Sequence, residues 1–235
     1  MNSKSTQTSE VMIEMIKASK IYQQEIKALN DISVSVATGE MFFIIGKSGA
    51  GKTTLLRLIS SMEQPTTGLV EIAGKPIYQM KGYKLARLRQ KIGVAYQDFK
   101  LLTDRTAAEN VAISMEVSYK KPQMIRNRVK ELLEQLDLSD KHDKIAGDLS
   151  RGEQQRITLA RAIANSPTMI LVDEPTGNLD ASTTERVMNL LTKCNKSGAT
   201  VVIATHDDSI YKHTPHRIME LQKGRVLSET RGNGA

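Results

Sequence analysis

One stretch of eight residues constrains this chain more than any other. Gly46–Thr53 reads GKSGAGKT and matches the pattern G-x-x-x-x-G-K-[ST]. The apolar run Met41–Ile45 precedes it, and leucines at helical spacing follow it. Glycines let successive backbone N–H groups point inward around phosphate oxygens, and the N-terminus of a following helix favours negative charge. The stretch therefore predicts a strand, a phosphate-binding loop and a helix, in that order.

The same loop predicts the contacts of a bound nucleotide. The Lys52 ammonium would bridge the β and γ phosphates, and the Thr53 hydroxyl would ligate Mg²⁺. The alternative is a glycine-rich turn without a ligand, and the flanking strand and helix patterns argue against it. The residues expected to hold the nucleotide are Gly46, Lys47, Ser48, Gly49, Ala50, Gly51, Lys52, Thr53 and Thr54.

Phosphoryl transfer also needs a metal ligand and a positioned nucleophile, and a second stretch offers both. The apolar residues Ile170–Val172 are followed directly by Asp173 and Glu174. Asp173 would hold Mg²⁺, and Glu174 would orient or deprotonate the attacking water. Alone, this pair also fits an acidic surface turn. Together with the loop at Gly46, it predicts metal-dependent hydrolysis of a nucleotide.

The apolar pattern predicts an α/β fold. Met41–Ile45, Met169–Val172 and Val201–Ala204 are short, unbroken apolar runs, which are typical of parallel strands covered on both faces. From Thr106 to Asn165 only helical patterns occur, which predicts a helical insertion. We expect a loose arm over residues 1–11, a domain over 12–230 with a helical subdomain at about 106–165, a hairpin turning at Lys223-Gly224, and a tail over 231–235.

The chain is basic, with 33 Lys and Arg against 26 Asp and Glu, a net charge of +7 and a pI near 9.4. Between Ile72 and Gln97 there are six basic residues and no acidic one. Two interpretations stay open: a solvated helix face, or a face that attracts phosphate or an anionic membrane surface. Aromatic residues are only 4% and Trp is absent, so we expect no nucleic-acid partner.

Other global features bear on location. The single cysteine, Cys194, excludes an intrachain disulfide and suits a reducing compartment. No apolar run approaches the roughly 20 residues that span a bilayer, and the opening MNSKSTQTSE has no apolar core typical of a secretion signal. We therefore expect a cytoplasmic protein.

A third motif resembles that of a known family. Leu149 is followed by SRGEQQR at Ser150–Arg156, which resembles the signature motif of ABC ATPases. It precedes the strand of Asp173, as in that family, and the stretch DEPTGNLD at Asp173–Asp180 follows. The resemblance covers about Ile13–Leu227. It implies an ABC ATPase nucleotide-binding domain: a RecA-like P-loop core with an antiparallel β subdomain and a helical subdomain.

The resemblance also implies how the site is assembled. Two copies would pair head to tail, with ATP and Mg²⁺ between the phosphate-binding loop of one and the signature motif of the other. Tyr22 would stack on adenine, although it also fits a residue that simply packs at a strand end. By the same resemblance, Ser150, Gly152 and Glu153 would act across the dimer, and Asp180 would lie at its seam. Gln97 would sense the γ-phosphate and touch the metal or water. His206 would contact the γ-phosphate. The implied catalytic set is Lys52, Gln97, Glu174 and His206, and the implied metal ligands are Thr53, Gln97 and Asp173.

One residue departs from the family pattern. The family usually has two glycines after the signature serine, and here the first is Arg151. A cation at this position would assist phosphate binding if it points inward and would have no effect if it points to solvent. It would also be able to crowd the dimer seam. Since Ser150 and Gly152 are intact, the departure bears on the rate of hydrolysis more than on ATP binding.

A longer segment points to a subgroup of the family. GEQQR with EPTGNLD resembles the branch that serves cell division, lipoprotein release, and export of peptides and macrolides. Gln97–Val111, read as QDFKLLTDRTAAENV, resembles the cell-division members, although Thr103 replaces a common proline. This implies an integral membrane partner docked beside residues 97–115, a location on the inner face of the membrane at the division site, and control of cell-wall hydrolysis.

Three other functions compete with this one. A transport ATPase for lipoprotein or peptide extrusion shares the chemistry but is not favoured by the segment at Gln97. Soluble regulators of the family usually carry coiled-coil insertions or two tandem ATPase halves, and neither pattern occurs here. A scaffold with vestigial hydrolysis is disfavoured because Glu174 and His206 are both present.

Overall fold

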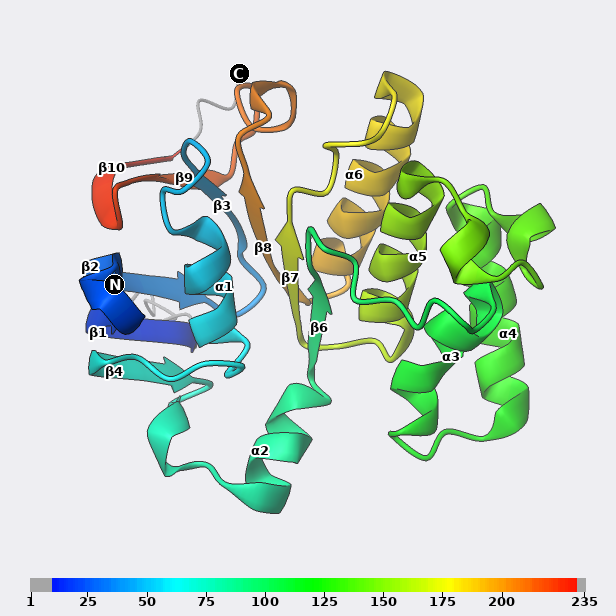
Figure 1. Cartoon of the computed structure of the whole chain (residues 1–235), viewed down its shortest axis with the longest axis horizontal. Helices are drawn as coiled ribbons and strands as arrows, with labels where there is room; N and C mark the ends of the chain where they lie inside the picture. Colours follow the sequence, from blue (N-terminus) through cyan, green and yellow to red (C-terminus); the bar gives the residue numbers. More distant parts are fainter. Residues whose placement is uncertain (1–9, 232–235) are drawn as a thin grey trace, which may run out of the picture.

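Two sheets organise the chain, and a group of helices lies to one side of them (Figure 1). The computed structural model describes residues 10–231. A six-stranded sheet has the order β10-β9-β3-β8-β7-β6, and a four-stranded sheet has the order β2-β1-β4-β5. The strands are β1 (Val11–Ile21), β2 (Lys27–Ala37), β3 (Met41–Ile45), β4 (Thr67–Ile72), β5 (Lys75–Pro76), β6 (Ile92–Ala95), β7 (Met169–Asp173), β8 (Thr200–Thr205), β9 (Arg217–Gln222) and β10 (Arg225–Arg231).

Six α-helices complete the described part of the chain. Short 3-10 turns also occur at residues 23–25, 77–79, 139–141, 146–148 and 208–210. The helices are α1 (Lys52–Ile59), α2 (Gly82–Arg89), α3 (Ala107–Glu116), α4 (Pro122–Gln135), α5 (Arg151–Ala164) and α6 (Ala181–Lys196).

The larger sheet separates two hydrophobic cores. Strands β3, β6, β7 and β8 pair in parallel, and alternate residues of each strand face opposite sides. Phe42 and Ile44 belong to the core that contains Leu55 of α1, which we call the α1-side core. Their neighbour Phe43 belongs to the core that contains Ile157 of α5, which we call the helix-side core. Both faces of these strands are therefore buried, as the unbroken apolar runs predict.

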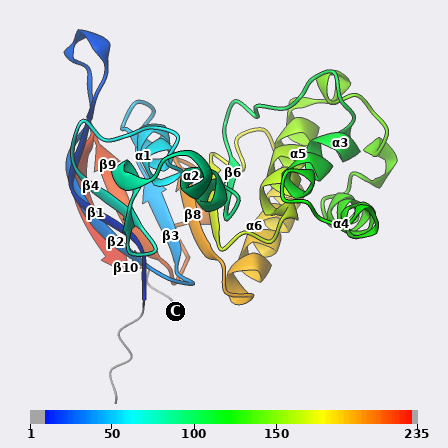
Figure 2. The same cartoon turned by 90° about the horizontal axis from the view of Figure 1, so that it is seen from below.

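The antiparallel sheet closes the α1-side core. Ile13 and Met15 of β1 are fully buried there, opposite residues of β2 and β4. Figure 2 shows this sheet and α1 on one side, and the group α3–α5 on the other. Of the expected arm at 1–11, residues 1–9 lie outside the described residues, and Val11 already begins β1. Of the expected tail, residues 232–235 lie outside as well.

Three helices occupy the region where a helical subdomain was expected, and two of them begin with the same device. At α3, Thr106 and Glu109 form a reciprocal capping box, and at α5 Ser150 and Glu153 do so. Such a box satisfies backbone N–H groups that otherwise have no partner at a helix start. The helices pack through Val111, Leu132 and Ile157 in the helix-side core.

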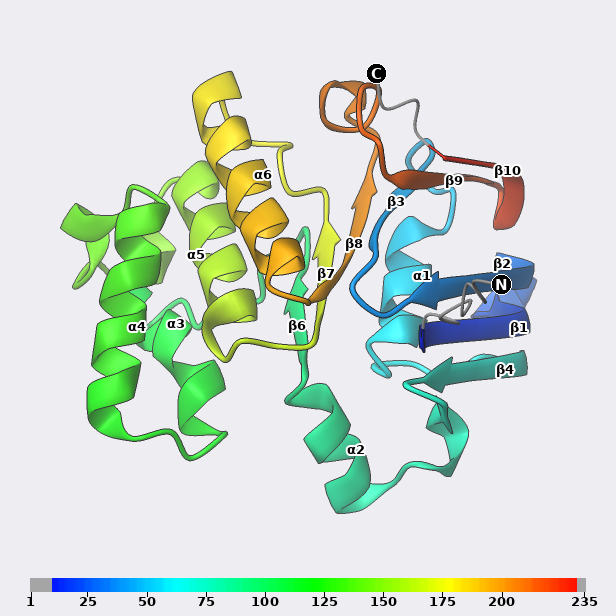
Figure 3. The same ribbon diagram turned by 180° about the vertical axis from the view of Figure 1, so that it is seen from behind.

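The hairpin at the end of the domain forms as expected, with Lys223-Gly224 as its turn (Figure 3). Cys194 is half-buried and packs against the edge of the helix-side core. Burial raises the pKa of its thiol. A raised pKa leaves little thiolate at neutral pH, so the environment of this cysteine is that of a structural residue and not of a reactive thiol.

Candidate active site

The loop after β3 has a backbone that only glycine tolerates at two positions. Gly46 has φ +149° and Gly51 has φ +108°, both outside the range that other residues readily adopt. A Cβ at Gly46 would lie 2.3 Å from the carbonyl oxygen of Leu221. α1 begins at Lys52, directly after Gly51, so the loop and the helix N-terminus form the phosphate-binding geometry that the motif predicts.

Lys52 is buried and turned toward the loop. Its Nζ donates a 2.7 Å hydrogen bond to the carbonyl oxygen of Gly46 and lies 3.2 Å from Oε1 of Glu174. Both side chains of this ion pair are less than a tenth exposed. The cation of the loop and the carboxylate after β7 therefore meet at the centre of the site.

Asp173 faces α1 because of the alternation along β7. Leu171, two residues earlier, lies in the α1-side core, so Asp173 points the same way and accepts a 2.7 Å hydrogen bond from Thr53 Oγ1. Its other oxygen, Oδ1, is buried without a hydrogen bond to any described residue. Burial raises the pKa of this carboxyl. A bound divalent cation would supply the missing partner, so the residues present fit Mg²⁺.

Glu174 is the most heavily bonded side chain of the site. Its Oε2 accepts hydrogen bonds from Thr205 Oγ1 and the His206 backbone, each 3.2 Å long, and its Oε1 lies 2.9 Å from Nδ1 of His206. The backbone turns here, with φ +51° at Glu174, and Gln155 Nε2 donates a 2.6 Å hydrogen bond to its carbonyl oxygen. The carboxylate is thus held at one position, between Lys52 and the imidazole.

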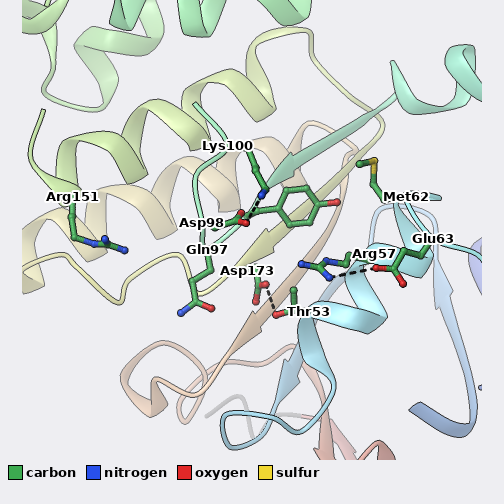
Figure 4. Close-up of a pocket in the computed structure, with 10 residues that line it drawn as sticks. Thr53, Arg57, Met62, Glu63, Gln97, Asp98, Lys100, Arg151 and Asp173 are labelled. Atoms are coloured by element: carbon green, nitrogen blue, oxygen red, sulfur yellow. Dashed lines mark hydrogen bonds and ion pairs between the residues drawn. The ribbon is translucent and has the colours of Figure 1, made fainter. Parts of the chain in front are cut away.

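A cavity of about 520 Å³ opens beside Thr53 and Asp173 (Figure 4). Gln97 also lines it, between Asp173 and Arg151 in the view of Figure 4, and Arg151 reaches it from the start of α5. The Arg151 side chain also lies over the ring of Phe99. Other lining residues are Arg57, Met62, Glu63, Tyr96, Asp98 and Lys100.

The signature residues lie at the N-terminus of α5 and are bonded among themselves. Ser150 Oγ donates a 2.7 Å hydrogen bond to Glu153 Oε2, and no described contact joins Ser150 to the loop at 46–54. Gly152 lies so close to the segment before α6 that a Cβ would be 3.0 Å from the Asn178 carbonyl oxygen. Asp180 caps α6, and hydrogen bonds from Thr183 and its neighbour Ser182 lower the pKa of this carboxyl to about 2.

The contacts of Tyr22 are with residues outside the phosphate-binding loop. Its hydroxyl donates a 2.8 Å hydrogen bond to Glu63 Oε2, and the Lys20 ammonium is 5.3 Å from the ring centroid. Glu63 also lies 3.4 Å from Arg57 of α1. These contacts place the ring at the end of β1, beside the last turn of α1.

The structure joins five predicted residues in two bonded sets, Thr53 with Asp173, and Lys52 and His206 with Glu174. Gln97 lines the same cavity as Thr53 and Asp173, whereas Tyr22, Ser150, Gly152, Glu153 and Asp180 lie outside both sets. Sequence reasoning missed Thr205 and Gln155, which hold Glu174. Thr205 had a usable signal, because it ends a buried strand directly before His206.

Comparison with known proteins identifies the family. The family model described as ABC transporter matches residues 29–177, more than half of the chain. This chain belongs to the ABC transporter ATPase family. The phosphate-binding loop and the strand with Asp173 both fall inside the matched range, so this ABC ATPase carries the family's motifs on the expected elements.

Curated relatives of this ABC ATPase include two cell-division proteins. The cell division ATP-binding protein FtsE of Bacillus subtilis is 42% identical over 222 residues, 94% of this chain and 97% of the relative. FtsE of Mycobacterium tuberculosis is also 42% identical, over 224 residues. The methionine import ATP-binding protein MetN 2 of Bacillus licheniformis is 39% identical over 93% of this chain, which spans 65% of that relative. The resemblance to cell-division ATPases is thereby confirmed.

Solved structures confirm the fold of the ABC ATPase. The ATP-binding cassette MJ0796, a dimer in a post-hydrolysis state with ADP and Pi, matches with a TM-score of 0.90 and 35% identity over 95% of this chain and 100% of that one. A second dimeric structure of MJ0796 matches equally well, at 36% identity. The chain is therefore an ATPase that binds ATP, in the fold predicted from its motifs.

Proposed function

We propose that this chain is the ATP-hydrolysing subunit of an FtsEX-like complex, in which ATP turnover moves a membrane partner that controls cell-wall hydrolysis during division. The observation that carries the proposal is the 42% identity to FtsE over nearly the full length of both chains. The segment Gln97–Val111, which resembles cell-division members, supports it.

In this proposal the two bonded sets of residues perform the hydrolysis. Lys52 binds the β and γ phosphates, and in doing so exchanges its contact with Glu174 for one with the nucleotide. Glu174 then accepts the proton of the attacking water, held in place by Thr205 and His206. His206 is two-thirds exposed, so its ring is free to reach the γ-phosphate. Gln97, which lines the cavity together with Asp173, positions the water.

Thr53 and Asp173 would hold Mg²⁺, with Gln97 completing the set. The free Oδ1 of Asp173 and the Thr53 hydroxyl are hard oxygen donors of the kind that this cation prefers. The cation supplies neutralisation of the charge that develops on the phosphate oxygens. Thr53, Asp173 and Gln97 would fix the position of the cation and surround it with partly buried side chains.

The remaining predicted residues act in a head-to-tail dimer. Ser150, Gly152 and Glu153 stand at a helix N-terminus, where backbone N–H groups favour a phosphate. Within one chain they make no bond to the loop at 46–54, so a second copy would bring them to the nucleotide. The dimeric form of the MJ0796 cassette supports this arrangement. Asp180 would lie at the seam, and Tyr22 would stack on adenine after leaving Glu63.

The loop after Gln97 supports a docked partner. Asn110 is fully buried and binds Leu102 through both backbone groups, with bonds of 2.8 and 2.9 Å. The Leu102 side chain is nevertheless 40% exposed, although Asn110 holds its backbone. Within residues 10–231, no helix has the length and apolarity to cross a bilayer. We propose that the partner resembles FtsX and places this chain on the inner face of the membrane at the division site.

A second candidate is the ATPase subunit of a transporter. The 39% identity to a methionine importer favours it, and lipoprotein or peptide export remains in the same class. The chemistry of the site is the same in both candidates, so the membrane partner distinguishes them.

The test is purification of tagged Glu174→Gln protein with ATP from detergent-solubilised membranes, followed by identification of what co-purifies. One small membrane protein with a large extracytoplasmic domain is the expected result. Recovery of transporter subunits instead would move the chain to the second candidate. Recovery of no membrane protein would contradict both.

Cross-linking refines the test. In a Cys194→Ser background the chain has no other cysteine, so Leu102→Cys places a single thiol on the proposed docking loop. We expect it to cross-link to the membrane partner. Val226→Cys, a matched exposed apolar position on β10, should not.

A further inference from the structure

Two segments far apart in sequence meet at one edge of the molecule. The first is the arm formed by β5 and α2, and the second is the loop at residues 117–121 between α3 and α4. Both lie at the lower edge in Figures 1 and 3. Gln90, which ends α2, donates a 3.0 Å hydrogen bond from Nε2 to the carbonyl oxygen of Val117. Asn165 joins them further, through a 2.8 Å bond to Ser118 Oγ. We call this edge the basic rim.

The rim has a single sign of charge. Residues 72–97 contain six basic residues and no acidic one, and the loop at residues 117–121 contains Lys120 and Lys121 and no acidic residue. All six basic residues of the first segment are exposed. Among the described residues, Lys81, Lys84 and Arg87 of the arm and Lys120 and Lys121 of the loop are exposed cations that make no ion pair.

Apolar and aromatic side chains stand between these cations. Tyr119 is 95% exposed and Tyr83 is 78% exposed. On α2, Tyr83 and Arg87 are one turn apart and lie opposite the half-buried Leu85 and Leu88. α2 has no buried residue, so its sequence is not explained by packing against the domain.

We propose that the basic rim binds an anionic phospholipid surface, with Lys81, Lys84 and Arg87 on headgroup phosphates and Tyr83 at the headgroup level. Clustered cations near a membrane attract anionic lipids, and amphipathic tyrosine rings prefer the boundary between water and lipid. A surface of many phosphates satisfies cations spread over two segments better than one small anion does. This binding goes beyond the proposed function, because it requires neither ATP nor a protein partner.

The experiment measures sedimentation of the full chain with vesicles of phosphatidylcholine, with and without phosphatidylglycerol. We expect binding only with phosphatidylglycerol. Lys81→Gln, Lys84→Gln and Arg87→Gln together should lower the partition coefficient about tenfold or more, since each cation near an anionic surface contributes roughly fivefold. The matched control is Lys144→Gln, Lys193→Gln and Lys196→Gln, which removes the same charge from exposed positions outside the rim.

A spectroscopic reporter tests contact directly. The chain contains no Trp, so Tyr83→Trp gives a fluorescence signal from one position only. Its emission should shift to shorter wavelength with phosphatidylglycerol vesicles, whereas that of Tyr211→Trp, outside the rim, should not.

Three results would overturn the proposal. They are absence of binding to phosphatidylglycerol vesicles, equal loss of binding in the rim and control variants, and an unshifted emission of Tyr83→Trp. Rim-dependent binding to poly-glutamate without binding to vesicles would assign the rim to an acidic protein segment instead.

Discussion

The guanidinium carbon of Arg151 lies 5.3 Å from the centroid of the Phe99 ring, so the first residue of α5 covers the loop that follows Gln97. That loop is strained, with φ +57° at Phe99 and φ +49° at Lys100. Arg161 of the same helix donates 2.6 Å hydrogen bonds to both carbonyl oxygens. Two arginines of α5 therefore hold the loop beside the cavity. Arg151 contacts the Phe99 ring, and Arg161 binds the backbone.

Arg151→Gly should change ATP turnover only modestly, by about fivefold or less. A partly exposed cation on an aromatic ring contributes about 0.5–1 kcal/mol, and Arg161 still holds the loop. Steady-state phosphate release measures the effect. Arg151→Lys keeps the cation and should lie closer to the parent. A loss of ATP-dependent dimerisation in Arg151→Gly would show instead that the arginine supports the dimer.

Glu174→Gln should lower hydrolysis about a hundredfold or more while ATP binding is kept, because the amide cannot accept the proton of water. A dimer with trapped ATP should then appear in size-exclusion chromatography. Glu185→Gln on the exposed surface of α6 is the matched control. Hydrolysis at the parental rate in Glu174→Gln would remove this carboxylate from the proposed role.

Lys52→Ala should abolish nucleotide binding, measured by titration with a fluorescent ATP analogue. The substitution removes the cation of the loop and also leaves the buried Glu174 carboxylate without its lysine partner. Thermal unfolding must therefore be followed in parallel. Lys144→Ala, an exposed lysine of the helical region, should bind ATP normally. Retained affinity in a folded Lys52→Ala protein would contradict the assignment.

Gly93→Ala should destabilise the fold by about 3 kcal/mol or more, an upper-range cost for overpacking. A Cβ there would lie 2.0 Å from the carbonyl oxygen of Ala162, so β6 and α5 would have to separate. Denaturant unfolding measures the change. Gly177→Ala, where a Cβ meets nothing within 4 Å, is the control and should be nearly neutral.

Asp180→Ala should lower the melting temperature at neutral pH, because Asp180 accepts the hydrogen bond that caps α6. The pKa of this carboxyl is about 2 in the folded protein, below its ordinary value of 3.8. A lowered pKa means that the ionised form stabilises the fold above about pH 4 and that this contribution is lost as pH falls toward 2. The difference between parent and Asp180→Ala should shrink over that interval. A difference independent of pH would contradict this.

The active-site strands and loop were predictable because their patterns are local. An unbroken apolar run followed by GKSGAGKT, or by Asp-Glu, predicts a strand and the loop after it from a segment of about ten residues. β1 escaped prediction for a physical reason: its ladder shifts register between Met15 and Ala18, around φ +46° at Lys17. A bulge of this kind breaks the alternation that identifies a strand. β6 has only four residues and lies inside the basic stretch.

The bonding of Glu174 was not predictable from the motif alone. Gln155 reaches its carbonyl oxygen from α5, 19 residues earlier in the chain, and only the packing of that helix brings them together. Arg151 shows the same limit, since its contact with Phe99 spans two segments whose proximity no local pattern encodes.

Phe42 and Phe43 are neighbours along the chain but belong to different cores, one on each face of the central sheet. The backbone of the sheet stands between them, so a change of volume on one face cannot be filled from the other. Substitutions at these two positions should therefore be compensated by different partners, Phe42 by residues around α1 and Phe43 by residues of the helical region. The two adjacent phenylalanines should therefore tolerate substitution independently of each other.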